Sequence, residues 1–169
     1  VSPSSLTFTS SNWNANQTVT VTGANDSLQD GNQSYTIVLA AAVSSDSNYS
    51  GLNPSDVTVS SIDDETEGFT VSIISGSQCM NCTTEAGGMV TFTVKLNSEP
   101  TANVTIGVTS SDTGEGTVSP SSLVFTSSNY NANQTVTVTG ANDNLADGDQ
   151  SYTIVLAAAS SSDSNYNSL

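Results

Sequence analysis

A long internal repeat constrains the fold more than any other feature of this sequence. Residues 1–52 align without gaps to residues 118–169, an offset of 117, and 44 of the 52 positions are identical. The eight differences are Thr7/Val124, Trp13/Tyr130, Ser27/Asn144, Gln29/Ala146, Asn32/Asp149, Val43/Ser160, Ser50/Asn167 and Gly51/Ser168. A repeat of this length is a whole domain rather than a short solenoid unit. The chain is therefore expected to cover roughly one and a half units of a tandem array.

Alternation of apolar and polar residues predicts the strands of one repeat. In 68–74 it places Phe69, Val71 and Ile73 on one face, and similar patterns occur in 56–62, 89–96, 103–109, 122–127, 134–140 and 151–157. Short alternating strands with turn-rich joints are typical of an all-β fold. The prediction is a seven-stranded antiparallel, Ig-like β-sandwich in tandem repeats of 117 residues.

The offset also predicts the domain boundaries. Residues 1–67 would form the C-terminal part of one repeat, and residues 68–169 the next repeat without its last strand. We expect that strand to come from sequence beyond Leu169 or, as the alternative, from a neighbouring chain by strand donation.

The charge balance restricts the partners of the chain. It has 16 acidic side chains against one basic side chain, Lys95, which gives a formal net charge of −15. Nothing in it could neutralise phosphates, so binding to nucleic acid or to an anionic membrane surface is excluded. No run approaches the roughly 20 apolar residues of a membrane span. Cations are the natural partners of such a surface.

Two acidic segments are candidate cation sites. The loop "NDNLADGD", residues 142–149, offers carboxylate and amide oxygens of the kind that Ca²⁺ binds, but Asn, Asp and Gly are also favoured by turn geometry alone. The cluster Asp63, Asp64 and Glu65 is either a polar linker or a clamp that shares a cation between consecutive domains.

Four motifs in order resemble the Calx-beta repeat: "TTEAGGMVTFTVKL", "SSDTGEGTVSPSSLVF", "QTVTVTGANDNLADGDQSYTIVL" and "VTVSSIDDE". That family is a seven-stranded sandwich of sodium–calcium exchangers, integrin β4 and very large bacterial surface proteins. The Ser/Thr/Asn-rich composition of the chain is similar to that of the bacterial long-repeat adhesins.

The resemblance implies a set of calcium ligands at one end of the sandwich. Carried over to this sequence, they are Glu85, Asp112, Asp143, Asp147, Asp63, Asp64 and Glu65, with Asp26 and Asp30 in the matching loop of the first unit. The strongest binders of the family have three consecutive aspartates where this chain has Asn142, Asp143 and Asn144. Because ligand charge tunes calcium affinity, we expect fewer or weaker sites here.

The two cysteines, Cys79 and Cys82, form the single C-x₂-C motif. A zinc site needs four ligands, and the chain has no histidine and no further cysteine. A local disulfide is favoured over an inter-chain disulfide or two free thiols, given the extracellular or cell-surface location that the composition indicates.

The sequence favours a structural role over an enzymatic one. A nucleophilic triad of the usual form needs a histidine, and Asp112-Thr113-Gly114 lacks the apolar lead-in strand of an aspartic protease. The prediction is a repeat of an extracellular adhesin, stalk or surface filament with calcium-stiffened junctions. Its partners would be neighbouring repeats of the same chain or identical chains.

Two alternatives remain open. One is a subunit of a non-covalent extracellular filament that is completed by β-strand exchange. The other is a calcium- or glycan-binding recognition module, in which Trp13 and its counterpart Tyr130 would stack on surface glycans rather than pack at an edge.

Overall fold

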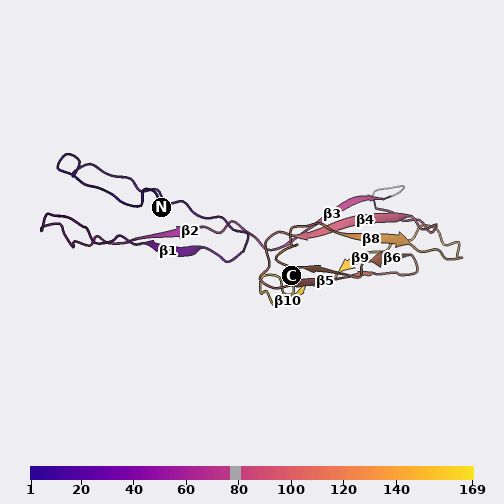
Figure 1. The fold of residues 1–169 in the computed structure, drawn as a ribbon. Helices are drawn as coiled ribbons and strands as arrows, with labels where there is room; N and C mark the ends of the chain where they lie inside the picture. The colour runs from indigo at the N-terminus through magenta and orange to yellow at the C-terminus, as the bar shows by residue number, and fades with distance from the viewer. Residues whose placement is uncertain (77–80) are drawn as a thin grey trace. The chain divides into compact units, whose positions relative to one another are not determined.

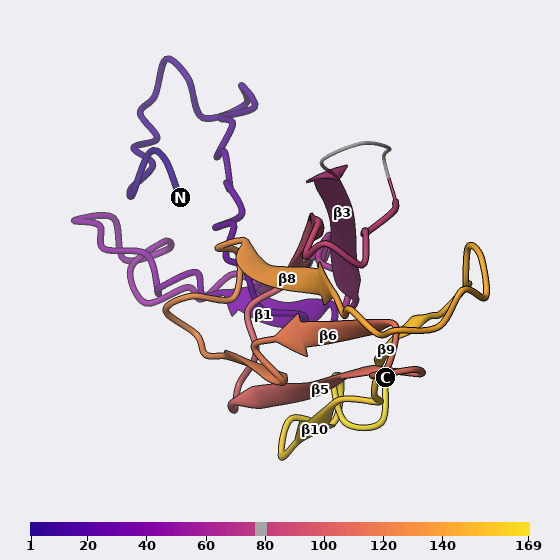
Figure 2. The ribbon, with the colours of Figure 1, turned by 90° about the vertical axis from the view of Figure 1, so that its right-hand side faces the viewer.

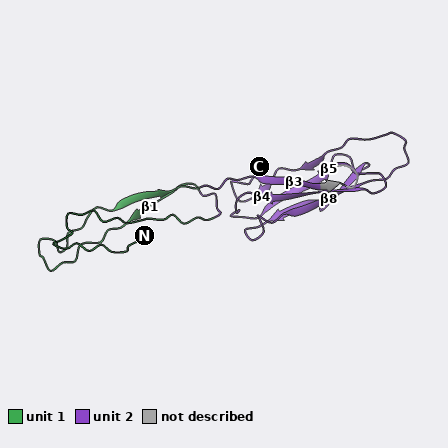
Figure 3. Ribbon diagram, turned by 90° about the horizontal axis from the view of Figure 1, so that it is seen from above, with its two compact units in different colours: residues 1–26, 31–63 green, residues 27–30, 64–169 purple. Residues whose placement is uncertain are grey.

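The computed structural model describes residues 1–76 and 81–169, which form strands and turns and contain no helix (Figure 1). The chain divides into two compact units: unit 1 comprises residues 1–26 and 31–63, and unit 2 comprises residues 27–30 and 64–169 (Figure 3). Unit 1 contains β1 (Gln33–Ile37) and β2 (Val57–Ser61). Unit 2 contains β3 (Phe69–Gly76), β4 (Met89–Leu96), β5 (Val104–Ser110), β6 (Gly116–Ser119), β7 (Ser122–Phe125), β8 (Gln134–Gly140), β9 (Ile154–Leu156) and β10 (Ser160–Ser161).

Unit 2 is a sandwich of two antiparallel sheets. One sheet has the order β3-β4-β8-β6, and in the other β5 lies between β10 and β7 and also pairs with β9. Figure 2 shows β5 and β10 in one layer and β6 and β8 in the layer facing it. The predicted all-β antiparallel sandwich is therefore confirmed.

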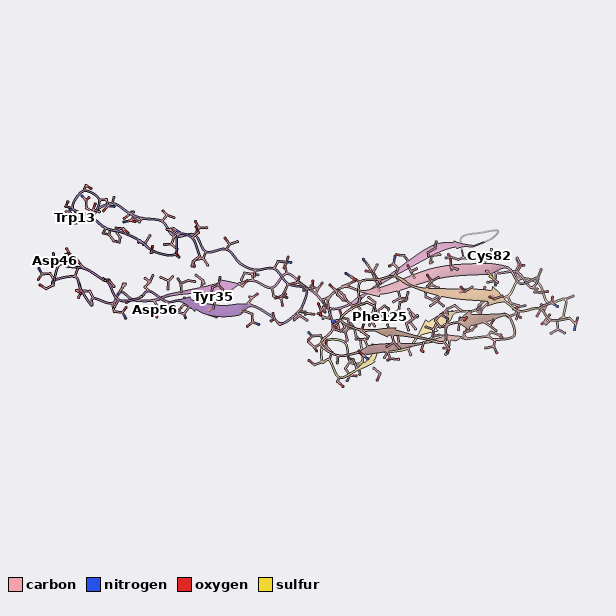
Figure 4. The ribbon with its side chains drawn as sticks, in the orientation of Figure 1. Trp13, Tyr35, Asp46, Asp56, Cys82 and Phe125 are labelled. Atoms are coloured by element: carbon pink, nitrogen blue, oxygen red, sulfur yellow. The ribbon has the colours of Figure 1, made fainter. Side chains whose placement is uncertain are left out.

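The core of unit 2 is built from alternate residues of four strands, as period-two patterning requires. The buried apolar side chains on these strands are Phe92, Val94 and Leu96 of β4, Val104, Ile106 and Val108 of β5, Leu123 and Phe125 of β7, and Val136 and Val138 of β8. Phe125 is fully buried and points between the sheets (Figure 4).

A buried tyrosine fastens the last turn of unit 2 to the corner between β4 and β5. The hydroxyl of Tyr166, a residue only 1% exposed, donates to the Ser98 carbonyl at 2.8 Å and accepts from the Ser98 N–H at 3.1 Å. The carboxylate of Asp163 accepts from the Thr101 N–H at 2.7 Å. These bonds satisfy polar groups that the packing removes from water.

Two short strands were not predicted from the sequence. β6 holds one apolar residue, Val118, and β10 is two serines, so neither shows a hydrophobic period. They become strands because β8 and β5 offer them backbone partners.

Unit 1 shows the same sequence in a different environment. Residues 5–8 and 17–23 repeat the sequence of β7 and β8 with one change, yet they are not strands. Leu6 and Phe8 are 37% and 57% exposed, whereas their counterparts Leu123 and Phe125 are buried. β4 and β5, which supply core residues around Leu123 and Phe125 in unit 2, have no counterpart among the residues of unit 1.

We expect Tyr166→Phe to destabilise the chain, because it leaves buried groups of Ser98 without their hydrogen-bond partner. Each buried polar group left unsatisfied costs about 1–3 kcal/mol. Urea unfolding followed by circular dichroism measures the effect. The matched control is Tyr49→Phe at the repeat-equivalent position, where Tyr49 is 59% exposed and the free energy of unfolding should stay unchanged. Equal effects at the two positions would contradict the described corner.

Candidate metal centre

Three acidic turns converge at one end of unit 2 because strand pairing brings their ends together. β5 ends at Ser110, β6 begins at Gly116 and β8 ends at Gly140. The Ala141 N–H donates to the Glu115 carbonyl at 2.8 Å, which joins the turn before β6 to the loop after β8. The Gly140 N–H donates to the Gly88 carbonyl at 3.0 Å, which adds the turn before β4. Figure 1 shows the loop after β8 at this end.

Two glycines allow this close approach. A Cβ at Gly116 would overlap the Tyr152 ring, and a Cβ at Gly140 would overlap the Thr84 carbonyl. Any other residue at Gly140 would therefore push the turn at Thr84 away, and any other residue at Gly116 would displace the Tyr152 ring.

The carboxylates of Glu115, Asp143 and Asp147 form a group in this region. One oxygen from each lies within 4.8 Å of the others. Asp143 also accepts from the Leu145 N–H at 2.9 Å, and this bond fixes the start of the loop. Two oxygens bound to one calcium ion at about 2.3–2.6 Å can be up to roughly 5 Å apart, so the donor set fits Ca²⁺.

The electrostatic environment agrees with the geometry. Partial burial raises the pKa of Glu115, followed in importance by the negative charges of Asp147, Asp143, Asp112 and Glu85. An acid whose pKa is raised by surrounding carboxylates marks a site where a cation would relieve repulsion.

Four of the ligands that the resemblance implied lie around Glu115. Asp143 and Asp147 belong to the group of three, and Asp112 and Glu85 are near enough to act on Glu115 by their charge. Asp112 also accepts from the Gly114 N–H at 2.9 Å, which shapes the turn.

The remaining implied ligands belong to both units. Asp26 and Asp63 lie in unit 1, and Asp30, Asp64 and Glu65 lie in unit 2. The Asp63 carboxylate accepts from the Gly31 N–H, and its own N–H donates to the Asn32 side chain at 3.0 Å. The cation clamp at Asp63, Asp64 and Glu65 stays a prediction, as do the calcium ligands Asp26 and Asp30.

Sequence reasoning missed Glu115. It stands in "DTGEG", next to the residues that were selected, but the resemblance assigned no role to its position. The signal was an acid directly before a glycine, and pairing of Gly116 with Gly140 gives that acid its place.

The predicted disulfide involves residues that are only partly described. Cys82 is disulfide-bonded, whereas Cys79 lies outside the described residues. The pairing of Cys79 with Cys82 therefore stays a prediction.

Comparison with known proteins identifies the family. The model of the Calx-beta domain matches residues 2–66 and 70–169, so the chain belongs to the Calx-beta family. These domains are β-sandwich modules that often occur in extracellular regions of proteins, and some bind calcium. No curated protein and no solved structure matches this chain. Among the described residues, no helix is long and apolar enough to cross a bilayer.

We expect the stability of the chain to fall as pH rises through the titration of Glu115. Because the pKa of Glu115 is raised above its ordinary value, 4.5, the folded chain binds this proton more tightly than the unfolded chain does. Stability from the protonated form is complete below the ordinary value and is lost as pH passes the raised one. In chelator, Glu115→Gln should raise the melting temperature at pH 7 more than at pH 4.

The matched control for this prediction is Glu99→Gln, which removes the same charge elsewhere in unit 2. It should change the melting temperature equally little at both pH values. If the Glu115→Gln variant and the parent melt at the same temperature at pH 7 in chelator, the proposed repulsion between Glu115 and the neighbouring carboxylates is contradicted.

Proposed function

We propose that this chain is a structural segment of a tandem Calx-beta array in an extracellular stalk or adhesin, and that Ca²⁺ bound at the domain ends stiffens it. The role is mechanical and non-enzymatic. The partners are neighbouring repeats of the same kind.

The single observation that carries the proposal is the group formed by Glu115, Asp143 and Asp147. It lies at the end of the sandwich, where carboxylate oxygens from two turns approach within 4.8 Å. Partial burial and, after it, the neighbouring negative charges raise the pKa of Glu115, so without a cation these carboxylates repel one another. Calcium supplies the charge that offsets this repulsion and holds the two turns together.

The near identity of the repeats supports the structural part of the proposal. Asp143 and Asp147 have exact counterparts, Asp26 and Asp30, at the same repeat positions. A loop that recurs with these two acids unchanged gives each domain of an array an equivalent end. Surplus negative charge keeps near-identical neighbours from associating side by side.

The side chains at the acidic end of unit 2 would hold the ion. Glu115, Asp143 and Asp147 would coordinate it directly, and Asp112 and Glu85 would strengthen the local negative potential. Two of the three adjacent positions in the loop are the neutral residues Asn142 and Asn144, which favours moderate affinity.

Calcium should raise the melting temperature of the full chain, because an ion that binds only the folded state stabilises it by mass action. At 100 times its dissociation constant a ligand contributes about 2.7 kcal/mol. Differential scanning calorimetry measures the shift between about 10 mM calcium, a concentration above the dissociation constants of most protein calcium sites, and excess chelator.

Matched substitutions in one loop place the ligands. Asp143→Asn and Asp147→Asn should each reduce the calcium shift, whereas Asp149→Asn, outside the group of three, should keep it. If the parent chain melts at the same temperature in calcium and in chelator, the calcium part of the proposal is wrong.

A further inference from the structure

The loop after β8 contains an Asp–Gly pair, Asp147 and Gly148, of which the proposed calcium site uses only the carboxylate. Both residues are exposed. Gly148 has a φ of 77°, and no atom beyond its chain neighbours lies within 4 Å of the place where a Cβ would stand. Since glycine has no side chain to hinder an approach to its backbone, the Gly148 nitrogen stands unshielded next to the carboxyl group of Asp147.

An aspartate followed by glycine can form a succinimide ring with its own backbone. The Gly148 nitrogen bonds to Cγ of Asp147, the nitrogen loses its proton and the carboxyl group its hydroxyl, and these two leave together as water. A nucleophile held next to its target by the chain reacts as if at very high concentration. Water then reopens the ring. Cleavage at Cγ restores aspartate, whereas cleavage at the main-chain carbonyl of Asp147 leaves isoaspartate, in which the main chain runs through Cγ.

A side-chain donor lies on the peptide group that reacts. Nε2 of Gln150 donates to the main-chain carbonyl oxygen of Asp147 at 2.9 Å. This oxygen and the Gly148 nitrogen belong to one resonant peptide group, so negative charge that develops on the nitrogen spreads onto the oxygen. A donor already aimed at developing charge stabilises it. Gln150 therefore assists the attack of the Gly148 nitrogen.

The equivalent pair in the first repeat, Asp30 and Gly31, has the same φ at glycine, 77°, but different hydrogen bonds. The Gly31 N–H donates to the Asp63 carboxylate, a negative group that disfavours loss of the N–H proton. Nε2 of Gln33, the counterpart of Gln150, donates to the Gly31 carbonyl at 3.1 Å, which belongs to the next peptide group. The same two residues are therefore less reactive in the first repeat.

We propose that Asp147 and Gly148 form a self-modifying site, at which Asp147 converts to isoaspartate with Gln150 as the assisting donor and water as the only other reactant. Isoaspartate lengthens the main chain and displaces the carboxylate relative to Glu115 and Asp143, with which it forms a group. The modification therefore breaks up that group as the protein ages. This inference goes beyond the proposed function, and the reaction does not depend on calcium.

Incubation of the full chain at neutral pH in excess chelator tests the site. Isoaspartate is counted by methylation with an isoaspartate methyltransferase and located by peptide mapping with mass spectrometry. It should accumulate at Asp147, and faster there than at Asp30. If it accumulates at neither aspartate, or at equal rates at both, the proposal is overturned.

Substitutions at the two neighbours of Asp147 separate this route from general damage. Gly148→Ala should suppress isoaspartate at Asp147, because a Cβ hinders the nitrogen. Gln150→Glu, which removes the donor but keeps the shape, should slow the reaction roughly two- to tenfold. Gln150→Lys, which keeps a donor, should react at least as fast as the parent. The matched control is Gln33→Glu, which should leave the rate at Asp147 unchanged.

Two results with these variants would overturn the proposal. An undiminished rate in Gly148→Ala would show that the ring does not form through the Gly148 nitrogen. An equal loss of rate in Gln150→Glu and Gln33→Glu would show that the Gln150 amide does not act on the reacting peptide group.

Calcium gives a separate readout, and this part alone rests on the proposed function. An ion that holds the Asp147 carboxylate keeps it from reacting, so about 10 mM calcium should slow isoaspartate formation at Asp147 relative to chelator. If the rates are equal while isoaspartate still accumulates, Asp147 is not a calcium ligand and the proposed function is wrong at this residue. The modification site would stand, so the two failures are distinguishable.

Discussion

Burial of apolar side chains between β4 and β5 is the interaction on which the rest of unit 2 depends. These two strands supply Phe92, Val94 and Leu96 on one side and Val104, Ile106 and Val108 on the other. β7 and β8 form strands where they pair with β5 and β4 and bury their own apolar faces. Tyr166 and Asp163 then form hydrogen bonds to the corner that joins β4 to β5. The apolar packing between these two strands therefore positions both sheets and the final turn.

The acidic end of the sandwich is a consequence of this packing. Pairing of β6 with β8 aligns Gly116 with Gly140, and the acidic turns on either side of that pair are brought together whatever their charge. The fold thus overcomes the partial burial and, after it, the repulsion between carboxylates that raise the pKa of Glu115. A cation would offset the repulsion between the carboxylates that the strand pairing brings together. The proposed calcium site is therefore a consequence of the same packing that forms the core.

The candidate site was predictable in part. Asp143 and Asp147 could be selected from the sequence because they occupy an acidic loop that resembles the family pattern. Glu115 could not, since its position depends on a four-residue strand, β6, that has no hydrophobic period. The other acids that the resemblance implied, Asp26, Asp30, Asp63, Asp64 and Glu65, divide between two units, which the sequence did not indicate.

The two near-identical segments, residues 1–52 and 118–169, separate what sequence determines from what tertiary structure decides. The sequence alone determines the local turns: the Thr9 N–H donates to Asn12 at 2.5 Å, and the Thr126 N–H donates to Asn129 at 2.6 Å, in spite of their different surroundings. Whether the adjoining residues become strands was decided only by tertiary structure. Leu123 and Phe125 lie in a strand and are buried, whereas Leu6 and Phe8 are neither. A turn satisfies its hydrogen bonds within a few residues, but a strand needs backbone partners and an apolar surface that distant segments must bring.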